Sequence, residues 1–316
     1  MPTRLPGTDL DLFPLVLGGN VFGWSADEEQ SFAVLDAYVA AGGNVIDTAD
    51  AYARWLGHGG GESETIIGRW MASRGNRDSL VVCTKVGKNA PLDNLRPETI
   101  RAAVELSLSR LQTDRIDLYY AHQDHDDDMG EALATFDALV REGLVRHVAA
   151  SQYSAARLGQ ALDLQREHGW SPYVALQTEY NLMARSDFET QYAGLCVQRG
   201  LGALPYYGLA RGYLTGKYRA GGPAVESVRS ASVDAFVGER GERVLDALGS
   251  AADAHGVTRG AVALAWLRTR PGVVAPIASA RTPEQLADLL PMATLSLTDD
   301  ELARLDAASA ADPADD

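Results

Sequence analysis

Short apolar runs rich in β-branched residues recur along the chain, and a segment with the period of an amphipathic helix follows most of them. A run that is apolar at nearly every position is typical of a parallel strand buried on both faces. We predict eight strands, over residues 14–18, 44–47, 80–85, 116–122, 145–151, 173–179, 202–207 and 273–279. Eight strands alternating with helices close most economically into a (β/α)8 TIM barrel, an α/β fold, although strand count alone also allows an open doubly wound sheet.

Polar residues and proline between these runs indicate where helices begin. The segments 25–28 and 186–189 have the Ser-x-x-Glu spacing of a capping box, and Pro97 suits the first turn of a helix. Residues 4–14 could form a small hairpin that caps the bottom of the barrel. The acidic residues from about 308 to 316 are expected to fray.

Composition narrows the class of protein. The chain has 316 residues and no Pro-, Gly- or Ser-rich linker, so we predict a single domain over residues 1–316. A formal net charge of −15 argues against nucleic-acid and anionic-membrane partners. Both cysteines lie in apolar surroundings, and no apolar run approaches the ~18 residues of a membrane span. We therefore expect a soluble cytoplasmic protein, while nothing in the pattern sets an oligomeric state.

Three consecutive predicted strands end in an ionisable residue, namely Asp47, Lys85 and His122. Each one alone is explained most simply by a structural ion pair or a packed histidine. A barrel, however, brings the carboxyl ends of neighbouring strands together, where active sites are built. The sequence therefore predicts that these residues converge, with Tyr52 in the loop after Asp47.

This set of residues suggests proton transfer to a carbonyl oxygen. A lysine ammonium within a few Å of Tyr52 favours the phenolate and lowers the pKa of the phenol. Asp47 would keep Lys85 charged and fixed, and His122 could orient a substrate oxygen. Such a site can protonate the alkoxide that develops when hydride adds to a carbonyl. Lys85 as a Schiff-base nucleophile is an alternative, which a nearby Asp47 opposes because it keeps the amine charged.

Several other motifs come close to known sites. GGNVFG (18–23) lacks the spacing of a Rossmann fingerprint, and GYLTGKY (212–218) is one residue short of a Walker A loop. We interpret the glycine-rich GHGGGES (57–63) as a flexible barrel loop. HQDHDDD (122–128) lacks the ligand spacing of a metal site, so we expect a solvated loop and no metal.

The sequence resembles the aldo-keto reductase superfamily over nearly its whole length. The resemblance rests on GGNVIDTADAY (42–52), TKVG (84–87), IDLYYAHQDH (116–125), LQTEYNL (176–182), LTGKY (214–218) and ARTPEQL (280–286). It implies a (β/α)8 barrel that reduces aldehydes or ketones with NAD(P)H and without a Rossmann motif. It further implies that Tyr52 is the general acid, Lys85 and Asp47 tune it, and His122 orients the substrate. A cofactor-sensing regulatory subunit is a second alternative within this resemblance.

The resemblance also assigns cofactor contacts. They are Gly19, Asn20, Asp47, Ser151, Gln152, Gln177, Tyr206, Leu209, Arg211, Lys217, Arg229, Ser279, Arg281 and Gln285. Among them, Tyr206 would stack on the nicotinamide, Lys217 and Arg229 would contact the pyrophosphate, and Arg281 suits a 2′-phosphate. This favours NADPH over NADH. Four positions depart from the residues usual in the family, namely Asn20, Gln152, Gly208 and Leu289.

Aromatic residues in loops after the strands are expected to line a substrate pocket. They are Trp24, Trp55 and Tyr207, although each could also simply pack within its loop. Few residues remain after the last predicted helix to form a long loop over the barrel mouth. We therefore expect an open pocket that accepts a range of small carbonyl compounds.

Overall fold

The computed structural model describes residues 2–125, 127–218 and 233–310. Its main sheet has eight parallel strands in the order β10-β3-β4-β5-β6-β7-β8-β9. These are β3 (Val16–Gly18), β4 (Val45–Asp47), β5 (Val81–Val86), β6 (Ile116–Ala121), β7 (Val145–Ser151), β8 (Tyr173–Gln177), β9 (Gly202–Ala203) and β10 (Ile277–Ala278). The sheet closes because Val274 N donates to Ala203 O at 2.9 Å and Ile277 N to Pro205 O at 2.8 Å. The predicted TIM barrel is confirmed, and the open sheet is excluded.

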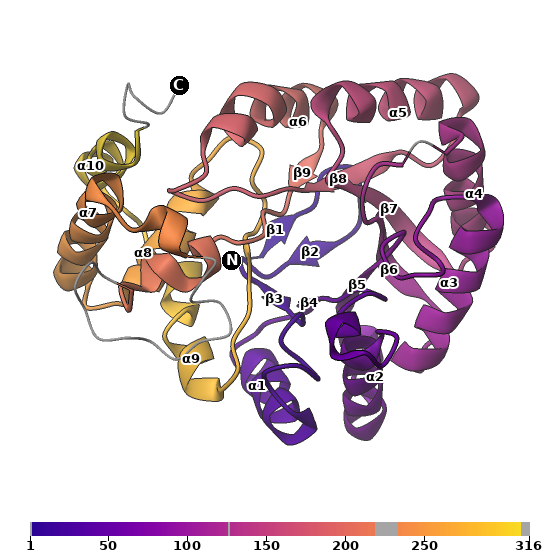
Figure 1. Ribbon diagram of the computed structural model, residues 1–316, viewed down its shortest axis with the longest axis horizontal. Helices are drawn as coiled ribbons and strands as arrows, with labels where there is room; N and C mark the ends of the chain where they lie inside the picture. Colours follow the sequence, from indigo (N-terminus) through magenta and orange to yellow (C-terminus); the bar gives the residue numbers. More distant parts are fainter. Residues whose placement is uncertain (1, 126, 219–232, 311–316) are drawn as a thin grey trace.

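Helices surround the barrel (Figure 1). They are α1 (Glu28–Ala40), α2 (Glu62–Arg74), α3 (Pro97–Leu111), α4 (Met129–Arg141), α5 (Ala155–His168), α6 (Ala193–Arg199), α7 (Glu239–His255), α8 (Arg259–Arg268), α9 (Pro283–Ala287) and α10 (Asp299–Ser309). Short helical turns are η1 (Arg54–Leu56), η2 (Arg77–Ser79), the π-helix η3 (Phe188–Tyr192), η4 (Ala210–Thr215), η6 (Asp234–Phe236) and η7 (Leu290–Ala293). No helix in the described ranges is long and apolar enough to cross a membrane.

Two apolar layers hold this arrangement. One lies between the strands and the outer helices, and it contains large buried side chains such as Trp70 and Trp266. The other fills the lower interior of the barrel with residues such as Val16, Val45 and Val81. Because the strands are buried on both faces, nearly all their positions are apolar.

The predicted N-terminal hairpin is present. Strands β1 (Thr3–Arg4) and β2 (Asp11–Leu12) pair antiparallel. Leu5, Leu10 and Leu12 are buried in the lower interior of the barrel and so cap its bottom. The acidic tail was placed too early, because α10 continues to Ser309; residues 311–316 lie outside the described part.

Some predicted boundaries were wrong. The α1 capping box is formed by Asp27 and Gln30 rather than by residues 25–28. Residues 186–189 form no capping box, because the chain is already helical there and Glu189 instead accepts hydrogen bonds from Tyr180 and Arg185. Pro97 opens α3 as predicted. The strands predicted at 202–207 and 273–279 are two residues long, since the chain beyond them turns aside to line a pocket.

Candidate active site

Lys85 is the centre of a buried hydrogen-bond network at the carboxyl ends of β4 and β5. Its Nζ donates to Asp47 Oδ2 at 2.7 Å, to the Thr48 carbonyl at 2.7 Å and to the Tyr52 hydroxyl at 3.0 Å. Lys85 is 1% exposed and Asp47 2%. A buried ammonium is tolerated only when a counter-charge and hydrogen bonds replace water. The predicted convergence of Asp47, Tyr52 and Lys85 is thus what the structure shows.

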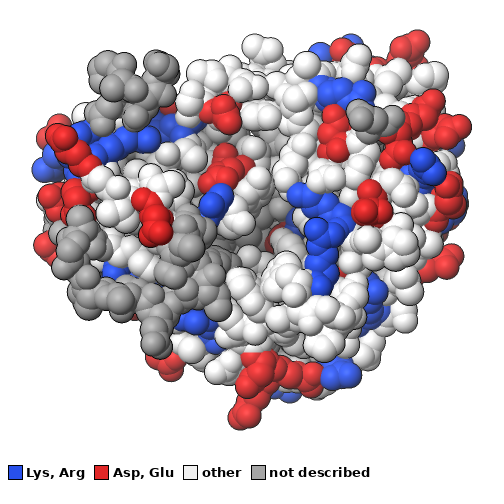
Figure 2. Space-filling view, in the orientation of Figure 1, with Lys and Arg blue, Asp and Glu red and all other residues white. Residues whose placement is uncertain are grey.

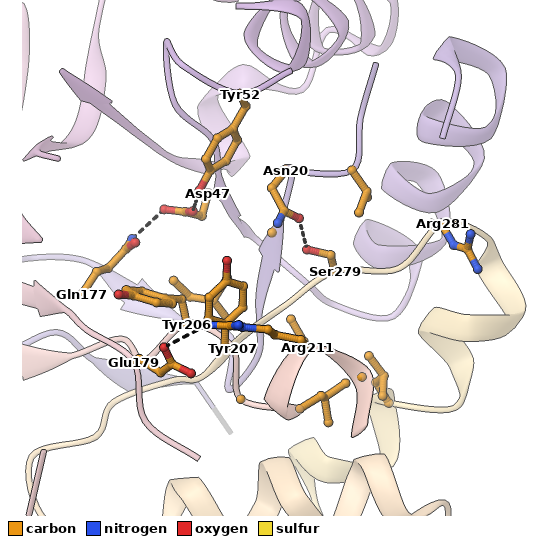
Figure 3. A pocket seen from close by; sticks show the side chains of 18 of the residues that line it. Asn20, Asp47, Tyr52, Gln177, Glu179, Tyr206, Tyr207, Arg211, Ser279 and Arg281 are labelled. Carbon is orange, nitrogen blue, oxygen red and sulfur yellow. Dashed lines mark hydrogen bonds and ion pairs between the residues drawn. The ribbon is translucent and has the colours of Figure 1, made fainter. Parts of the chain in front are cut away.

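Asp47 is held from a second side. Gln177, the last residue of β8, donates from Nε2 to Asp47 Oδ1 at 2.6 Å, so each carboxylate oxygen has a separate donor (Figure 3). The Tyr52 hydroxyl lies 3.3 Å from Asp47 Oδ2. Gln177, expected to contact the cofactor, therefore also orients the carboxylate.

The pKa of Tyr52 differs from the sequence expectation. Burial raises it most, the Lys85 ammonium lowers it, and the Asp47 charge raises it further, so the net pKa lies well above the usual value of the phenol. Lys85 therefore opposes the effect of burial without reversing it. Burial disfavours the charged form of Lys85 itself, but Asp47 and Tyr52 outweigh this and raise its pKa. In this arrangement Lys85 is charged and Tyr52 retains its proton.

His122 directly follows β6 and faces Tyr52. The two ring centroids lie 6.2 Å apart with an interplanar angle of 74°. Burial lowers the pKa of His122 well below its usual value, and the charges of Lys85, Lys88 and Arg54 lower it further, so the imidazole is neutral. Its Nδ1 is buried and has no hydrogen-bond partner among the described residues. A neutral imidazole beside Tyr52 can position a substrate oxygen.

A pocket of about 730 Å³ opens over this network. Most of the predicted contacts line it: Asn20, Asp47, Tyr52, Trp55, Lys85, His122, Ser151, Gln152, Gln177, Tyr206, Tyr207, Leu209, Arg211, Lys217, Ser279, Arg281 and Gln285. The volume is within the range of sites for organic ligands. The space-filling view shows the hollow near the centre of the molecule (Figure 2).

Three predicted residues do not line the pocket in the described structure. Gly19 lies beneath the wall, where its N–H donates to the Asp47 carbonyl at 2.7 Å. Trp24 packs edge-on against Trp55, with ring centroids 5.1 Å apart, and so supports the wall instead of forming it. Arg229 lies outside the described residues.

The donor set and the backbone fit a dinucleotide. A Cβ on Gly18 would lie 2.7 Å from Ser279 Oγ, so a larger residue would displace this pocket-lining side chain. Arg211, Lys217 and Arg281 supply positive charge along the pocket, and the Nε of Arg211 is buried without a hydrogen-bond partner among the described residues. Tyr206 provides a flat ring close to Gln177 (Figure 3). Phosphates pair with such cations, and a nicotinamide can stack on such a ring.

The loop after β9 has an unusual backbone. Tyr207, Ala210 and Arg211 have φ values of 54°, 46° and 58°, in the left-handed region that non-glycine residues rarely adopt. Strain of this kind clusters at ligand-binding segments. Glu179 Oε2 lies 3.7 Å from Arg211 Nη2 and holds this arginine at the pocket wall.

Sequence reasoning missed several lining residues. Two charged residues among them had a detectable signal: Glu179 is the last residue of the strand predicted over 173–179, and Lys88 follows the strand predicted over 80–85 by three residues. Thr258 and Asp288 also line the pocket; Thr258 caps α8 and donates to the Asp288 carbonyl at 2.6 Å. Their positions depend on how two helices pack, which the local pattern does not encode.

Three acidic residues of the run 122–128, namely Asp124, Asp127 and Asp128, have structural roles. Asp124 pairs with Arg157 at 2.8 Å, Asp127 accepts from Leu95 N at 2.9 Å, and Asp128 caps α4. Within the described residues, no group of three or more His, Cys, Asp and Glu side chains is arranged to hold a metal ion.

Comparison with known proteins agrees with this geometry. The sequence model of the Aldo/keto reductase family matches residues 14–310. The chain is 33% identical to norsolorinic acid reductase B of Aspergillus parasiticus, over 98% of this chain and 84% of the relative. It is 32% identical to Protein tas of Escherichia coli, over 96% of each, and 30% identical to a putative aryl-alcohol dehydrogenase of Saccharomyces cerevisiae, over 93% and 82%. The protein is an oxidoreductase of the aldo/keto reductase family.

Proposed function

We propose that this protein reduces aldehydes or ketones to alcohols with NADPH, and that Tyr52 supplies the proton. The observation that carries the proposal is the contact of Lys85 Nζ with the Tyr52 hydroxyl at 3.0 Å and with Asp47 Oδ2 at 2.7 Å. A phenol beside a fixed ammonium can give up its proton when an alkoxide develops, because the resulting phenolate is stabilised at once. The cofactor, when bound, supplies the hydride for the carbonyl carbon.

Each residue of the site has a distinct task. Tyr52 holds its proton at neutral pH, since its pKa is raised, and donates it to the substrate oxygen. Lys85 stabilises the phenolate, and Asp47 keeps Lys85 charged and in place. His122 is neutral, its Nδ1 has no partner within the described part of the chain, and it orients the carbonyl. General acid catalysis of this kind typically contributes about 10²–10⁴-fold in rate.

The adenosine end of the cofactor is proposed to lie at Arg281. This residue lines the pocket and lies far from the Asp47–Tyr52 group (Figure 3). Its backbone N–H donates to Gln285 Oε1 at 3.0 Å, which fixes the segment without occupying the side chain. Arginine can bind a phosphate through two parallel hydrogen bonds.

Fluorescence titration with NADPH and, separately, NADH tests this assignment. Removal of a charged hydrogen bond costs about 1.5–3 kcal/mol, so Arg281→Ala should weaken NADPH binding by roughly 10-fold or more and leave NADH binding unchanged. The NADPH affinity of Arg281→Lys should lie between those of wild type and Arg281→Ala, because lysine keeps the charge but cannot donate two parallel hydrogen bonds to the phosphate. Failure of both nucleotides to bind the wild-type protein, or an Arg281→Ala protein that binds NADPH unchanged, would overturn the assignment.

Two alternatives are disfavoured by the same network. A Schiff-base lysine must be neutral to attack, whereas Lys85 has a raised pKa and contacts a carboxylate. A purely regulatory subunit has no need of an intact proton donor, yet Asp47, Tyr52, Lys85 and His122 are all brought together. We also propose the cytoplasm as the location, since Cys83 and Cys196 are free, buried thiols that suit a reducing compartment.

A further inference from the structure

Two cations, Lys88 in the pocket wall and Arg54 next to it, form no ion pair with an acid among the described residues. Lys88 lines the pocket three residues after Lys85, and its Nζ donates to Gln152 Oε1 at 2.8 Å. Arg54, two residues after Tyr52 in η1, lies behind the lining residues, and its guanidinium donates to the Lys88 carbonyl. Neither side chain forms an ion pair with Asp or Glu within the described residues.

The neighbouring acids cannot neutralise them. Asp47 is already bound by Lys85 and Gln177, and Glu179 lies against Arg211. The positive charge of Lys88 and Arg54 acts on His122 in the site. Burial and the Lys85 charge lower the pKa of His122 most, and Lys88 and Arg54 lower it further. In a chain of net charge −15 with three lysines, all three lysines line this one pocket. Lys and Arg side chains are seen beside the central hollow in Figure 2.

The position of Lys88 separates it from the proposed phosphate contacts. Gln152, which Lys88 contacts, also donates from Nε2 to the His122 carbonyl at 3.2 Å. Lys88 therefore lies on the side of His122, whereas Arg281 lies at the opposite end of the pocket from Tyr52 (Figure 3). A phosphate on the adenosine end would not account for a cation beside His122.

Aromatic rings lie on the same side. Trp55 follows Arg54 directly, is 51% exposed, and packs edge-on against Trp24. An exposed indole next to two cations can bind a flat ring that carries negative charge, since the indole contacts the ring and the cations pair with the anion.

We propose that the substrate is an aromatic carbonyl compound that bears a carboxylate, and that Lys88 and Arg54 bind this carboxylate while His122 and Tyr52 engage the carbonyl. This inference rests on the proposed reductase function and specifies its substrate class. It makes Lys88 and Arg54 specificity-determining residues, because a neutral analogue of the same shape lacks the group that they bind.

A matched pair of substrates tests this. 4-Formylbenzoate and its methyl ester share the ring and the aldehyde and differ in charge. We expect kcat/KM for the acid to exceed that for the ester by roughly 10-fold or more, as for a charge-assisted contact. Added salt should reduce this ratio, because the cations are accessible to solvent.

Single substitutions test whether Lys88 and Arg54 cause the preference for the acid over the ester. The acid-to-ester ratio should fall toward one in Lys88→Gln and in Arg54→Gln, and it should persist in Lys88→Arg. Arg304→Gln on the surface helix α10 is the control and should keep the wild-type ratio. An ester that is reduced as well as the acid by the wild-type protein, or a ratio unchanged in both Gln variants, would overturn the inference and leave the reductase function intact.

A binding measurement separates the two proposals. If neither compound is reduced, the proposed function fails. Quenching of tryptophan fluorescence then tests, independently of turnover, whether the pocket binds a carboxylate, because Trp55 lines the pocket. Quenching by 4-formylbenzoate that is lost in Lys88→Gln supports the anion site, while equal quenching by acid and ester contradicts it.

Discussion

At the scale of single residues, the site depends on how burial and charge compete at one phenol. The Lys85 ammonium at 3.0 Å favours the phenolate of Tyr52, but burial and Asp47 favour the phenol, and the pKa of Tyr52 stays above its usual value. A proton donor needs its proton until the moment of transfer, so this balance suits reduction. The sequence indicated the four residues that meet here; it could not give the sign of the net pKa shift, which depends on the desolvation of Tyr52 in the folded protein.

The buried ion pair makes a stability prediction. Lys85→Met leaves Asp47 buried without its counter-charge, and loss of one partner of a buried pair costs about 3–5 kcal/mol. We expect a lower urea midpoint in this variant. Adding Asp47→Asn to Lys85→Met should recover part of the loss, because the buried charge is then gone. A double variant less stable than Lys85→Met alone would contradict this explanation.

Asp50 makes a prediction about pH. It is 2% exposed, and neither of its carboxylate oxygens accepts a hydrogen bond of normal geometry from the described residues. Burial, and then the charge of Glu64, raise the pKa of this carboxyl well above its ordinary value. Between the ordinary and the raised pKa the folded state binds more protons than the unfolded state, so Asp50 lowers the stability of the fold as pH rises.

Asp50→Asn removes this dependence, since the amide does not titrate. The variant should therefore gain stability relative to wild type as pH rises, so that the difference in the free energy of unfolding, variant minus wild type, is larger at pH 8 than at pH 5. Urea denaturation at both values measures it. If variant and wild type differ in stability by the same amount at pH 5 and pH 8, Asp50 ionises normally in the folded protein and the explanation is contradicted.

At the scale of elements, the apolar pattern predicted where strands occur better than where they end. The six strands from β3 to β8 lie where the pattern placed them, because a strand covered on both faces is apolar at almost every position. The loop after β9 was not predictable. Tyr207, Ala210 and Arg211 adopt left-handed backbone without being glycine, so the usual sequence signal for that conformation is absent.

The contact between α2 and α3 gives a matched test of helix packing. A Cβ on Gly68 in α2 would lie 2.1 Å from the Arg110 carbonyl of α3, whereas a Cβ on Gly159 in α5 has nothing within 4 Å. Gly68→Ala should destabilise the protein by about 1–3 kcal/mol or more, because the two helices must separate. Gly159→Ala should stabilise it by about 0.5–1 kcal/mol through helix propensity. Thermal denaturation compares them; a Gly68→Ala protein as stable as Gly159→Ala would contradict the close packing.

At the scale of the whole molecule, the three lysines of this strongly acidic chain all line the same pocket. The chain carries a net charge of −15, while Lys88, Lys217 and Arg281 provide local positive charge in the pocket, which supports the proposed binding of small anions there. The order of strands and the convergence of Asp47, Lys85 and His122 follow from the barrel and could be predicted. The placement of Trp24 behind Trp55, and the half-buried position of Lys88 in the pocket wall, follow from tertiary packing and could not be predicted.

Turnover by Tyr52→Phe, measured beside the wild-type protein, tests whether Tyr52 donates the proton to the carbonyl oxygen. Purified wild-type protein and Tyr52→Phe are each supplied with NADPH and an aromatic aldehyde, and NADPH consumption and alcohol formation are followed together. We expect one alcohol per NADPH in the wild type, a rate about 10²–10⁴-fold lower in Tyr52→Phe, and the same NADPH affinity in both proteins. Equal rates in the two proteins, or tight NADPH binding without alcohol formation in the wild type, would contradict the role of Tyr52 as proton donor in carbonyl reduction.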